Sequence, residues 1–123
     1  MCFMAMYMLM NAISNFEFAR ILEDLGYIVN VRDDVIEARR GNESLKVKIR
    51  GNTLSLESND YGVKCLEDLA EIIDELEFKG LMPKLIVLKS PYIYSLEKKK
   101  GATRKLLESL GFDIKEIYDS YCG

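Results

Sequence analysis

Histidine is absent from this chain of 123 residues, which has only two prolines and three cysteines. Cys2, Cys65 and Cys122 are far apart and odd in number, so their spacing indicates neither a disulfide framework nor a metal-binding knuckle. Without histidine, the sequence also lacks the ligands of a typical zinc site. We therefore expect reduced thiols and a cytoplasmic location.

Long apolar runs and a large excess of one charge are missing too. The apolar stretch at residues 1–10 has only about half the length of a membrane span, and no basic residue precedes it as in a secretory signal. The net charge of −3 argues against a protein whose whole surface binds phosphate backbones. We therefore expect no membrane partner, and at most a local basic face.

The residues that are present suffice for one packed domain over residues 1–123, because 49% of the chain is hydrophobic and 30% is charged. Residues 1–12 form an apolar N-terminal extension with two open interpretations. The extension could pack as an additional strand or helical turn. Alternatively, the biological start could be Met8 or Met10.

Three helices are expected from the spacing of the apolar residues. The first covers residues 15–25, where Ser14 and Glu17 have the spacing of a capping box. The second covers residues 63–78 and the third residues 102–110, each followed by a glycine that can end a helix.

Strands are expected on both sides of the second helix. Period-two alternation and Gly-Asn turns predict a meander of short antiparallel strands before it. An uninterrupted apolar run and a final apolar segment predict two parallel strands after it, covered by helices on both faces of the sheet. The expected strands are residues 27–32, 35–39, 45–50, 53–57, 85–88 and 114–118.

The predicted fold class is therefore α/β, a single-domain mixed sheet flanked by helices, in the order α-β-β-β-(β)-α-β-α-β. Within this order stand the segments Phe16-Glu17, Leu25-Gly26-Tyr27-Ile28-Val29, Asp34-Val35-Ile36, Arg39-Arg40-Gly41-Asn42 and Lys46-Val47-Lys48. Together they resemble the restriction-endonuclease-like, or PD-(D/E)XK, fold, and more narrowly Mrr-type endonucleases and archaeal Holliday-junction resolvases.

This resemblance implies catalytic roles for Glu17, Asp34 and Lys48, with Asp34 as a ligand of Mg²⁺. In the family, two carboxylates hold the metal, and the lysine steadies the attacking water and the developing charge. Here Lys46 stands where the second carboxylate is expected, and lysine cannot ligate a metal. The resemblance therefore implies a nuclease-like protein that binds DNA or RNA, with weak or lost metal-dependent phosphodiesterase activity.

A nearby carboxylate could replace the missing one. The sequence offers Glu37, Glu43 and Glu57 on the surrounding strands. Unless one of them reaches the site, metal-assisted hydrolysis is disabled.

Each candidate residue also has an ordinary structural explanation. Glu17 suits the return half of a capping box, and Asp33-Asp34 is a common turn dipeptide. Lys46, Lys48 and Arg50 alternate as on any solvated strand face, although like charges so close together add little stability. These three cations are therefore a candidate nucleic-acid-binding face.

A second candidate nucleic-acid-binding cluster consists of Lys98, Lys99, Lys100 and Arg104. If a short helix begins at Pro91, the lysines lie at its C-terminus, where the helix dipole favours them without any ligand. If a helix begins near Ala102 instead, they crowd its positive end, and a bound anion would explain them.

Two other functions stay open. The acidic composition favours a non-enzymatic protein-interaction module, including one that forms a homodimer. From Leu54 onward, the element order and residues 104–112 resemble GNAT acyltransferases. The turn at residues 58–62 has one glycine and an aspartate where that family binds pyrophosphate, so this alternative is more distant.

Overall fold

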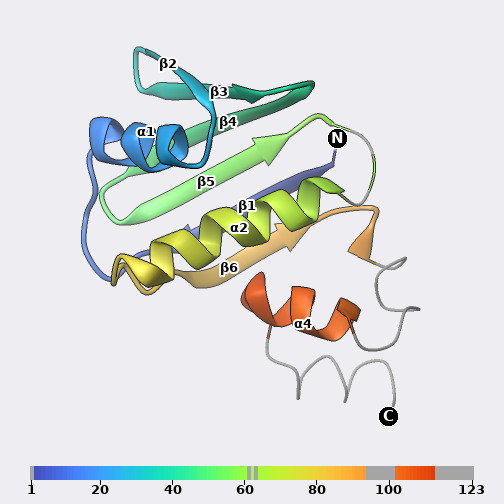
Figure 1. Cartoon of the computed structure of the whole chain (residues 1–123). Coiled ribbons are helices and arrows are strands. Elements are labelled where there is room, and N and C mark those ends of the chain that lie inside the picture. Colours follow the sequence, from blue (N-terminus) through green and yellow to red (C-terminus); the bar gives the residue numbers. More distant parts are fainter. Residues whose placement is uncertain (1, 61, 63, 94–101, 113–123) are drawn as a thin grey trace.

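The computed structural model describes residues 2–60, 62, 64–93 and 102–112, which form a six-stranded sheet with helices packed on it (Figure 1). In chain order the described elements are β1 (Phe3–Met8), α1 (Asn15–Asp24), β2 (Ile28–Arg32), β3 (Val35–Arg40), β4 (Glu43–Arg50), β5 (Thr53–Ser58), α2 (Lys64–Phe78), β6 (Lys84–Lys89) and α4 (Ala102–Ser109). The predicted α/β class is confirmed. The strand predicted at residues 114–118 lies outside the described residues. None of the described helices is long and apolar enough to cross a membrane.

The predicted antiparallel meander forms one half of the sheet. The strand order is β2-β3-β4-β5-β1-β6, and every neighbouring pair is antiparallel. Asp33-Asp34 and Gly41-Asn42 make the tight turns on either side of β3. Asp33 has a φ of 53°, a left-handed conformation that aspartate tolerates better than most residues. The turn interpretation of this dipeptide is therefore confirmed.

The N-terminal extension forms an interior strand. β1 pairs with both β5 and β6. Phe3, Ala5 and Tyr7 are buried in the core, while Met4 and Met6 alternate with them on the other face. Because both faces carry apolar residues, the sequence showed no clean period of two here. The additional-strand interpretation is confirmed.

The strand at residues 85–88 corrects two predictions. It forms β6, but it is antiparallel to its neighbour β1 rather than parallel. It is also the outermost strand of the described sheet, with Ile86 50% exposed, rather than a strand covered on both faces. The reason is that β1 lies between β5 and β6. Because both are antiparallel to β1, β5 and β6 run in the same direction, and α2 connects them as a crossover helix.

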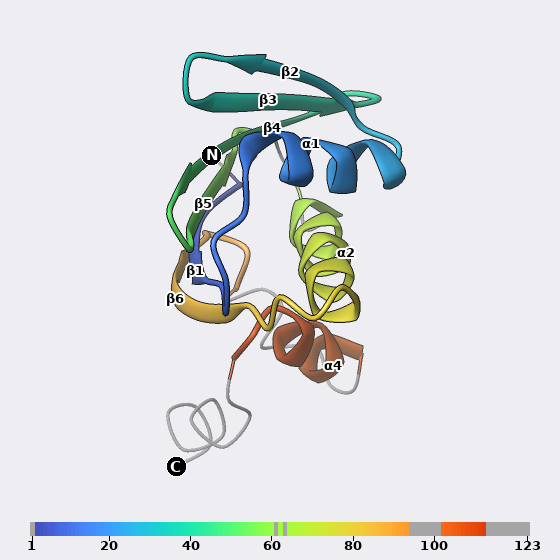
Figure 2. The same cartoon turned by 90° about the vertical axis from the view of Figure 1, so that its left-hand side faces the viewer.

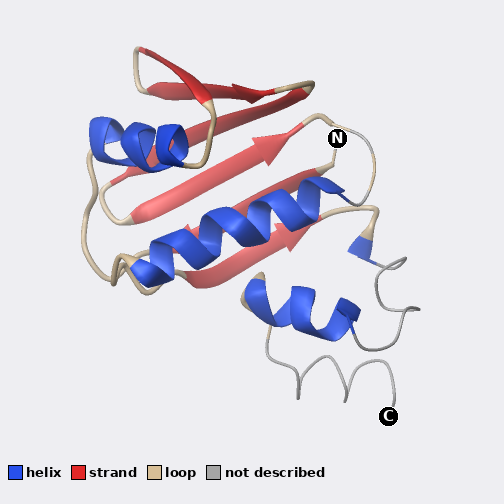
Figure 3. Ribbon diagram, viewed as in Figure 1, coloured by secondary structure: helices blue, strands red, loops and turns tan. Residues whose placement is uncertain are grey.

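The described helices all lie on one face of the sheet (Figures 2 and 3), so the prediction of helices on both faces is wrong. α1 packs beside β2 and β3, and α4 packs beside α2. Ser14 caps α1 as predicted, because its Oγ accepts a hydrogen bond from the Glu17 amide at 3.1 Å. The Tyr7 hydroxyl donates to the Leu110 carbonyl and ties α4 to β1.

Two of the three cysteines form a pair that their spacing did not predict. Cys2 and Cys65 are both buried and lie next to each other, with their Cα atoms 6.4 Å apart, a separation that a disulfide can span. The pair joins the start of β1 to α2 across 63 residues of sequence. This proximity allows a bond to form under oxidising conditions, and reduced thiols stay a prediction for these two residues.

Candidate nucleic-acid interface

The sheet has a second face that no described helix covers, which we call the open face (Figure 2). Directly paired residues of antiparallel strands project to the same side, so the strand register identifies its members. They are Ile28, Asn30, Arg32, Val35, Glu37, Arg39, Ser44, Lys46, Lys48, Arg50, Thr53, Ser55, Glu57, Met4, Met6, Met8, Lys84, Val87 and Lys89.

The alternation predicted for β4 is confirmed. Lys46, Lys48 and Arg50 are exposed on the open face, and Leu45 and Val47 are buried on the helix side. The hydrophobic effect fixes this arrangement, because a shift by one residue would bury the cations and expose the apolar side chains.

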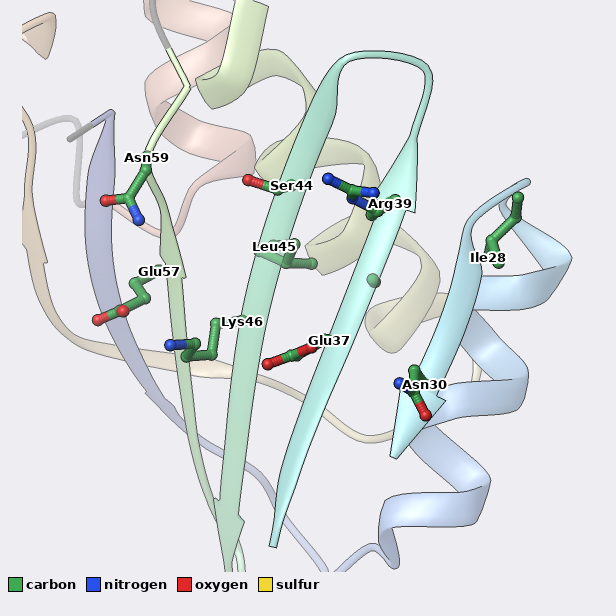
Figure 4. A pocket seen from close by; sticks show the side chains of 10 residues that line it. Ile28, Asn30, Glu37, Arg39, Ser44, Leu45, Lys46, Glu57 and Asn59 are labelled. Atoms are coloured by element: carbon green, nitrogen blue, oxygen red, sulfur yellow. The ribbon is translucent and has the colours of Figure 1, made fainter. Parts of the chain in front are cut away.

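The cations of β4 have different neighbours. Lys46 lies directly between Glu57 and Glu37 of the flanking strands (Figure 4). Lys48 lies between Val35 and Ser55, neither of which carries a charge. The sheet therefore gives Lys46 two anionic neighbours and gives Lys48 none directly opposite.

Charge is distributed unevenly between the two sides of the molecule. The open face carries the cations Arg32, Arg39, Lys46, Lys48, Arg50, Lys84 and Lys89 and the carboxylates Glu37 and Glu57. Helix α2 carries Glu67, Asp68, Glu71, Asp74, Glu75 and Glu77 and only one cation, Lys64. A chain with a net charge of −3 thus has a local basic face.

Two depressions lie on the open face. The larger, of about 410 Å³, follows β2, β3 and β4, with Asn30, Arg39 and Lys46 among its lining residues (Figure 4). The smaller, of about 140 Å³, lies between the methionines of β1 and the lysines of β4. Lys46 and Glu57 line both depressions, so the two are adjacent.

The three catalytic candidates are not gathered into one site. Glu17 lies on α1, on the helix side of the sheet, where its Oε1 accepts a hydrogen bond from Ser14 Oγ at 3.2 Å. Lys48 projects from the open face. Asp34 lies in the turn before Val35, the cross-strand partner of Lys48, so these two are near the same end of the sheet. They form no ion pair among the described residues.

The described part of the chain contains no group of three or more cysteine, aspartate or glutamate side chains placed to hold a metal ion. Of the carboxylates considered as replacements, Glu37 and Glu57 flank Lys46 on the open face, and Glu43 turns toward α2. Lys98, Lys99 and Lys100 lie outside the described residues, and Arg104 is placed only as part of the α4 backbone.

A cluster that the sequence did not predict lies where the β3–β4 turn meets α2. Arg40 donates to Asp68 Oδ1 at 2.9 Å, to Glu71 Oε1 at 2.8 Å and to the Leu25 carbonyl at 2.8 Å. Its guanidinium also lies 4.4 Å from the centre of the Tyr27 ring. The neighbours Arg39 and Arg40 therefore have separate roles, because only Arg39 faces the open side.

Glu43 and Asp68 form a carboxyl pair within this cluster. Glu43 Oε2 and Asp68 Oδ2 are buried. Neither oxygen accepts a hydrogen bond from any other described group. Burial, a hydrogen bond to Glu43 and the charge of Glu43 raise the pKa of Asp68 to about 6. Burial alone would raise the pKa of Glu43, but hydrogen bonds with Asp68 and Lys64 and the charges of Lys64 and Arg40 lower it. As the pH falls, Asp68 therefore takes up a proton before Glu43 does.

The sequence signal for this pair was weak. Glu43 and Asp68 are 25 positions apart and belong to different elements, so only their approach in the fold shows that they interact.

Comparisons with protein-family models, with curated proteins and with solved structures found no match to this chain.

Proposed function

We propose that this chain binds nucleic acid through the open face of its sheet. The observation that carries the proposal is the position of Lys48 and Arg50, which project from β4 with no carboxylate directly opposite. Neighbouring cations on a strand repel each other mildly, so the fold itself gains little from placing them together. A phosphate backbone would neutralise them and release its own counterions.

The distribution of charge supports the same proposal. An acidic protein that binds nucleic acid needs its cations on one face, because its remaining surface repels phosphate. Here the acidic residues of α2 lie on the helix side, away from the open face. The polyanion would therefore approach in one orientation.

The test compares two double variants with the same loss of charge. Lys48→Ala/Arg50→Ala removes two cations from the open face, and Arg20→Ala/Lys79→Ala removes two from the helix side. We expect the first to weaken binding of a fluorescein-labelled oligonucleotide about tenfold at low salt, and to reduce the slope of log affinity against log salt by about 1.4 for a single strand or about 1.8 for a duplex. The second should retain most of the affinity and the slope.

Two results would reject this function. One is an absence of binding by the unaltered chain to single-stranded, duplex and junction oligonucleotides at low salt. The other is an equal loss in both double variants, which would mean that only net charge matters.

Cleavage is a separate question from binding. If metal-dependent phosphodiesterase activity accompanies it, Lys48→Ala should abolish cleavage in Mg²⁺. Lys46→Glu should increase cleavage, because it adds a carboxylate between Glu37 and Glu57, where a metal needs anionic oxygens. Cleavage that persists in EDTA, or that Lys48→Ala leaves unchanged, would reject a metal-dependent site here.

A further inference from the structure

The smaller depression on the open face has two chemically different sides. Lys46 and Lys48 of β4 line one side, and Met4 and Met6 of β1 line the other. β5 lies between them, and its Ser55 is the direct partner of both Lys48 and Met6. The short serine side chain leaves the space between the long side chains open.

The methionines on this face do not contribute to the described core. Met4, Met6 and Met8 are 36%, 37% and 45% exposed, whereas Phe3, Ala5 and Tyr7 of the same strand are buried. Methionine has a polarizable thioether that packs well against aromatic rings. An exposed column of methionines beside a column of cations is therefore suited to a ligand that is both anionic and aromatic.

We infer that this depression holds one unpaired nucleotide of a single strand, with its phosphate at Lys46 and Lys48 and its base on Met4 and Met6. This inference rests on the proposed nucleic-acid binding and specifies the substrate class. Two strand spacings, roughly 10 Å, separate the lysine and methionine columns, within reach of one nucleotide. Ser55 and Glu57 between them can hydrogen-bond to the sugar or to the base edge.

A duplex could contact only one of the two columns of side chains. Its phosphates could reach the lysines, but its bases are stacked on one another and offer no free face to the methionines. Proteins that bind single strands combine a cationic track with side chains on which unpaired bases rest. The apolar column thus favours a single strand over a duplex.

The adjoining depression extends the site to a second nucleotide. It shares Lys46 and Glu57 with the first and adds hydrogen-bonding groups of Asn30, Arg39 and Asn59. Two adjacent depressions suit consecutive nucleotides of one strand better than a free mononucleotide. A second copy of this chain is a poor occupant, because its own open face would bring the same cations together.

The experiment measures fluorescence anisotropy with a labelled single-stranded oligonucleotide and with the same strand annealed to its complement. We expect the unaltered chain to bind the single strand about tenfold more tightly. Met6→Ser should weaken binding of the single strand about fivefold and leave binding of the duplex unchanged. Phe16→Ser, which alters a residue that is 79% exposed on the helix side, should change neither.

Salt dependence and folding supply two internal checks. Lys48→Ala should lower the salt slope for the single strand by about 0.7, the value for one phosphate contact to unpaired nucleic acid. Met6→Ser should still unfold in one cooperative transition well above the temperature of the binding assay, because Met6 lies outside the buried core.

The outcomes separate this inference from the function on which it rests. Equal or tighter binding of the duplex, with no effect of Met6→Ser, would overturn the single-strand inference and leave nucleic-acid binding intact. Competition by a mononucleotide as strong as by the strand would overturn it as well. Binding to phosphatidylserine vesicles but to no oligonucleotide would reject both.

Discussion

At the residue scale, Arg40 and Asp68 illustrate how the fold gives charged residues a partner that the sequence does not indicate. The Arg40 side chain is 25% exposed and that of Asp68 is 13% exposed, so their ion pair at 2.9 Å is partly shielded from water. Glu43 contributes a second carboxylate, whose Oε2 lies 3.7 Å from the same Arg40 nitrogen and whose Oε1 binds Lys64 at 2.8 Å. The cluster joins β3, β4 and α2, and its stability depends on where one proton resides.

Asp68→Asn should change how stability depends on pH. The pKa of Asp68 is raised from 3.8 to about 6 in the fold, so the folded state binds this proton more tightly than the unfolded chain. The resulting contribution to stability is complete below about pH 4 and is lost as the pH rises through 6. Relative to the unaltered chain, the variant should gain roughly 1 to 2 kcal/mol between pH 4 and 7.

Urea unfolding at a series of pH values measures this difference. Glu67→Gln removes one carboxylate from the exposed side of the same helix and separates the effect of total charge. Parallel pH profiles for Asp68→Asn and the unaltered chain would contradict the raised pKa of Asp68.

At the scale of elements, the local signals in the sequence predicted most helices and strands. Gly41-Asn42 and the alternation on β4 define the hairpin without help from the rest of the fold, and the Ser14 cap starts α1 at the expected residue. The local signals did not distinguish β1 as a strand. Its methionines are as apolar as its core residues, so the strand period is hidden, and only pairing with β5 and β6 establishes it.

The direction of β6 depends on the same N-terminal strand. Its apolar run is typical of a strand buried in a parallel sheet, but a chain segment from the far N-terminus occupies the position beside it. The candidate site shows the same limit. The sequence predicted the exposed cations Lys46, Lys48 and Arg50. It could not predict that the methionines of β1 share their face, because that depends on the pairing of β1 with β5.

Gly111 should be the most sensitive position where α4 meets the sheet. Its φ is 104°, and a Cβ there would lie 3.0 Å from the Cβ of Leu85. Gly80, which follows α2 as Gly111 follows α4, also has a positive φ, 79°, but no heavy atom lies within 4 Å of its would-be Cβ. Both alanine variants should lose about 1 to 2 kcal/mol from backbone strain, and Gly111→Ala should lose about 1 to 3 kcal/mol more from overpacking.

Urea unfolding of the two glycine variants compares these losses directly. Because both glycines follow a helix and have φ values of 79° and 104°, most of the conformational strain is common to both variants, and the difference reports mainly the contact with Leu85. Equal stabilities would show that α4 does not need the close approach at Gly111.

Cys2 and Cys65 should form a disulfide under oxidising conditions. A small-molecule disulfide such as oxidised glutathione takes two electrons and two protons from the thiols and closes a loop of 63 residues. A loop of this length should raise the free energy of unfolding by about 4 kcal/mol relative to the reduced chain. Cys2→Ser should remove this response, and thiol counting after denaturation should find two fewer thiols in the oxidised chain than in the reduced one.

At the scale of the whole molecule, the two sides of the sheet differ in burial and in charge. The helix side holds the core and most of the acidic residues, and the open face holds exposed cations and methionines. A sheet needs only one covered face to be stable when its strands are antiparallel. The described elements leave the other face uncovered, and we propose that its cations bind a polyanion.

The most direct test of that account is an amide chemical-shift titration of the folded chain with a single-stranded oligonucleotide at low salt. The account predicts shifts that follow β4, β5 and β1, including the amides of Lys46, Lys48, Ser55 and Met6, with little change along α2. Shifts confined to α2 and α4, or no shifts at saturating oligonucleotide, would contradict it.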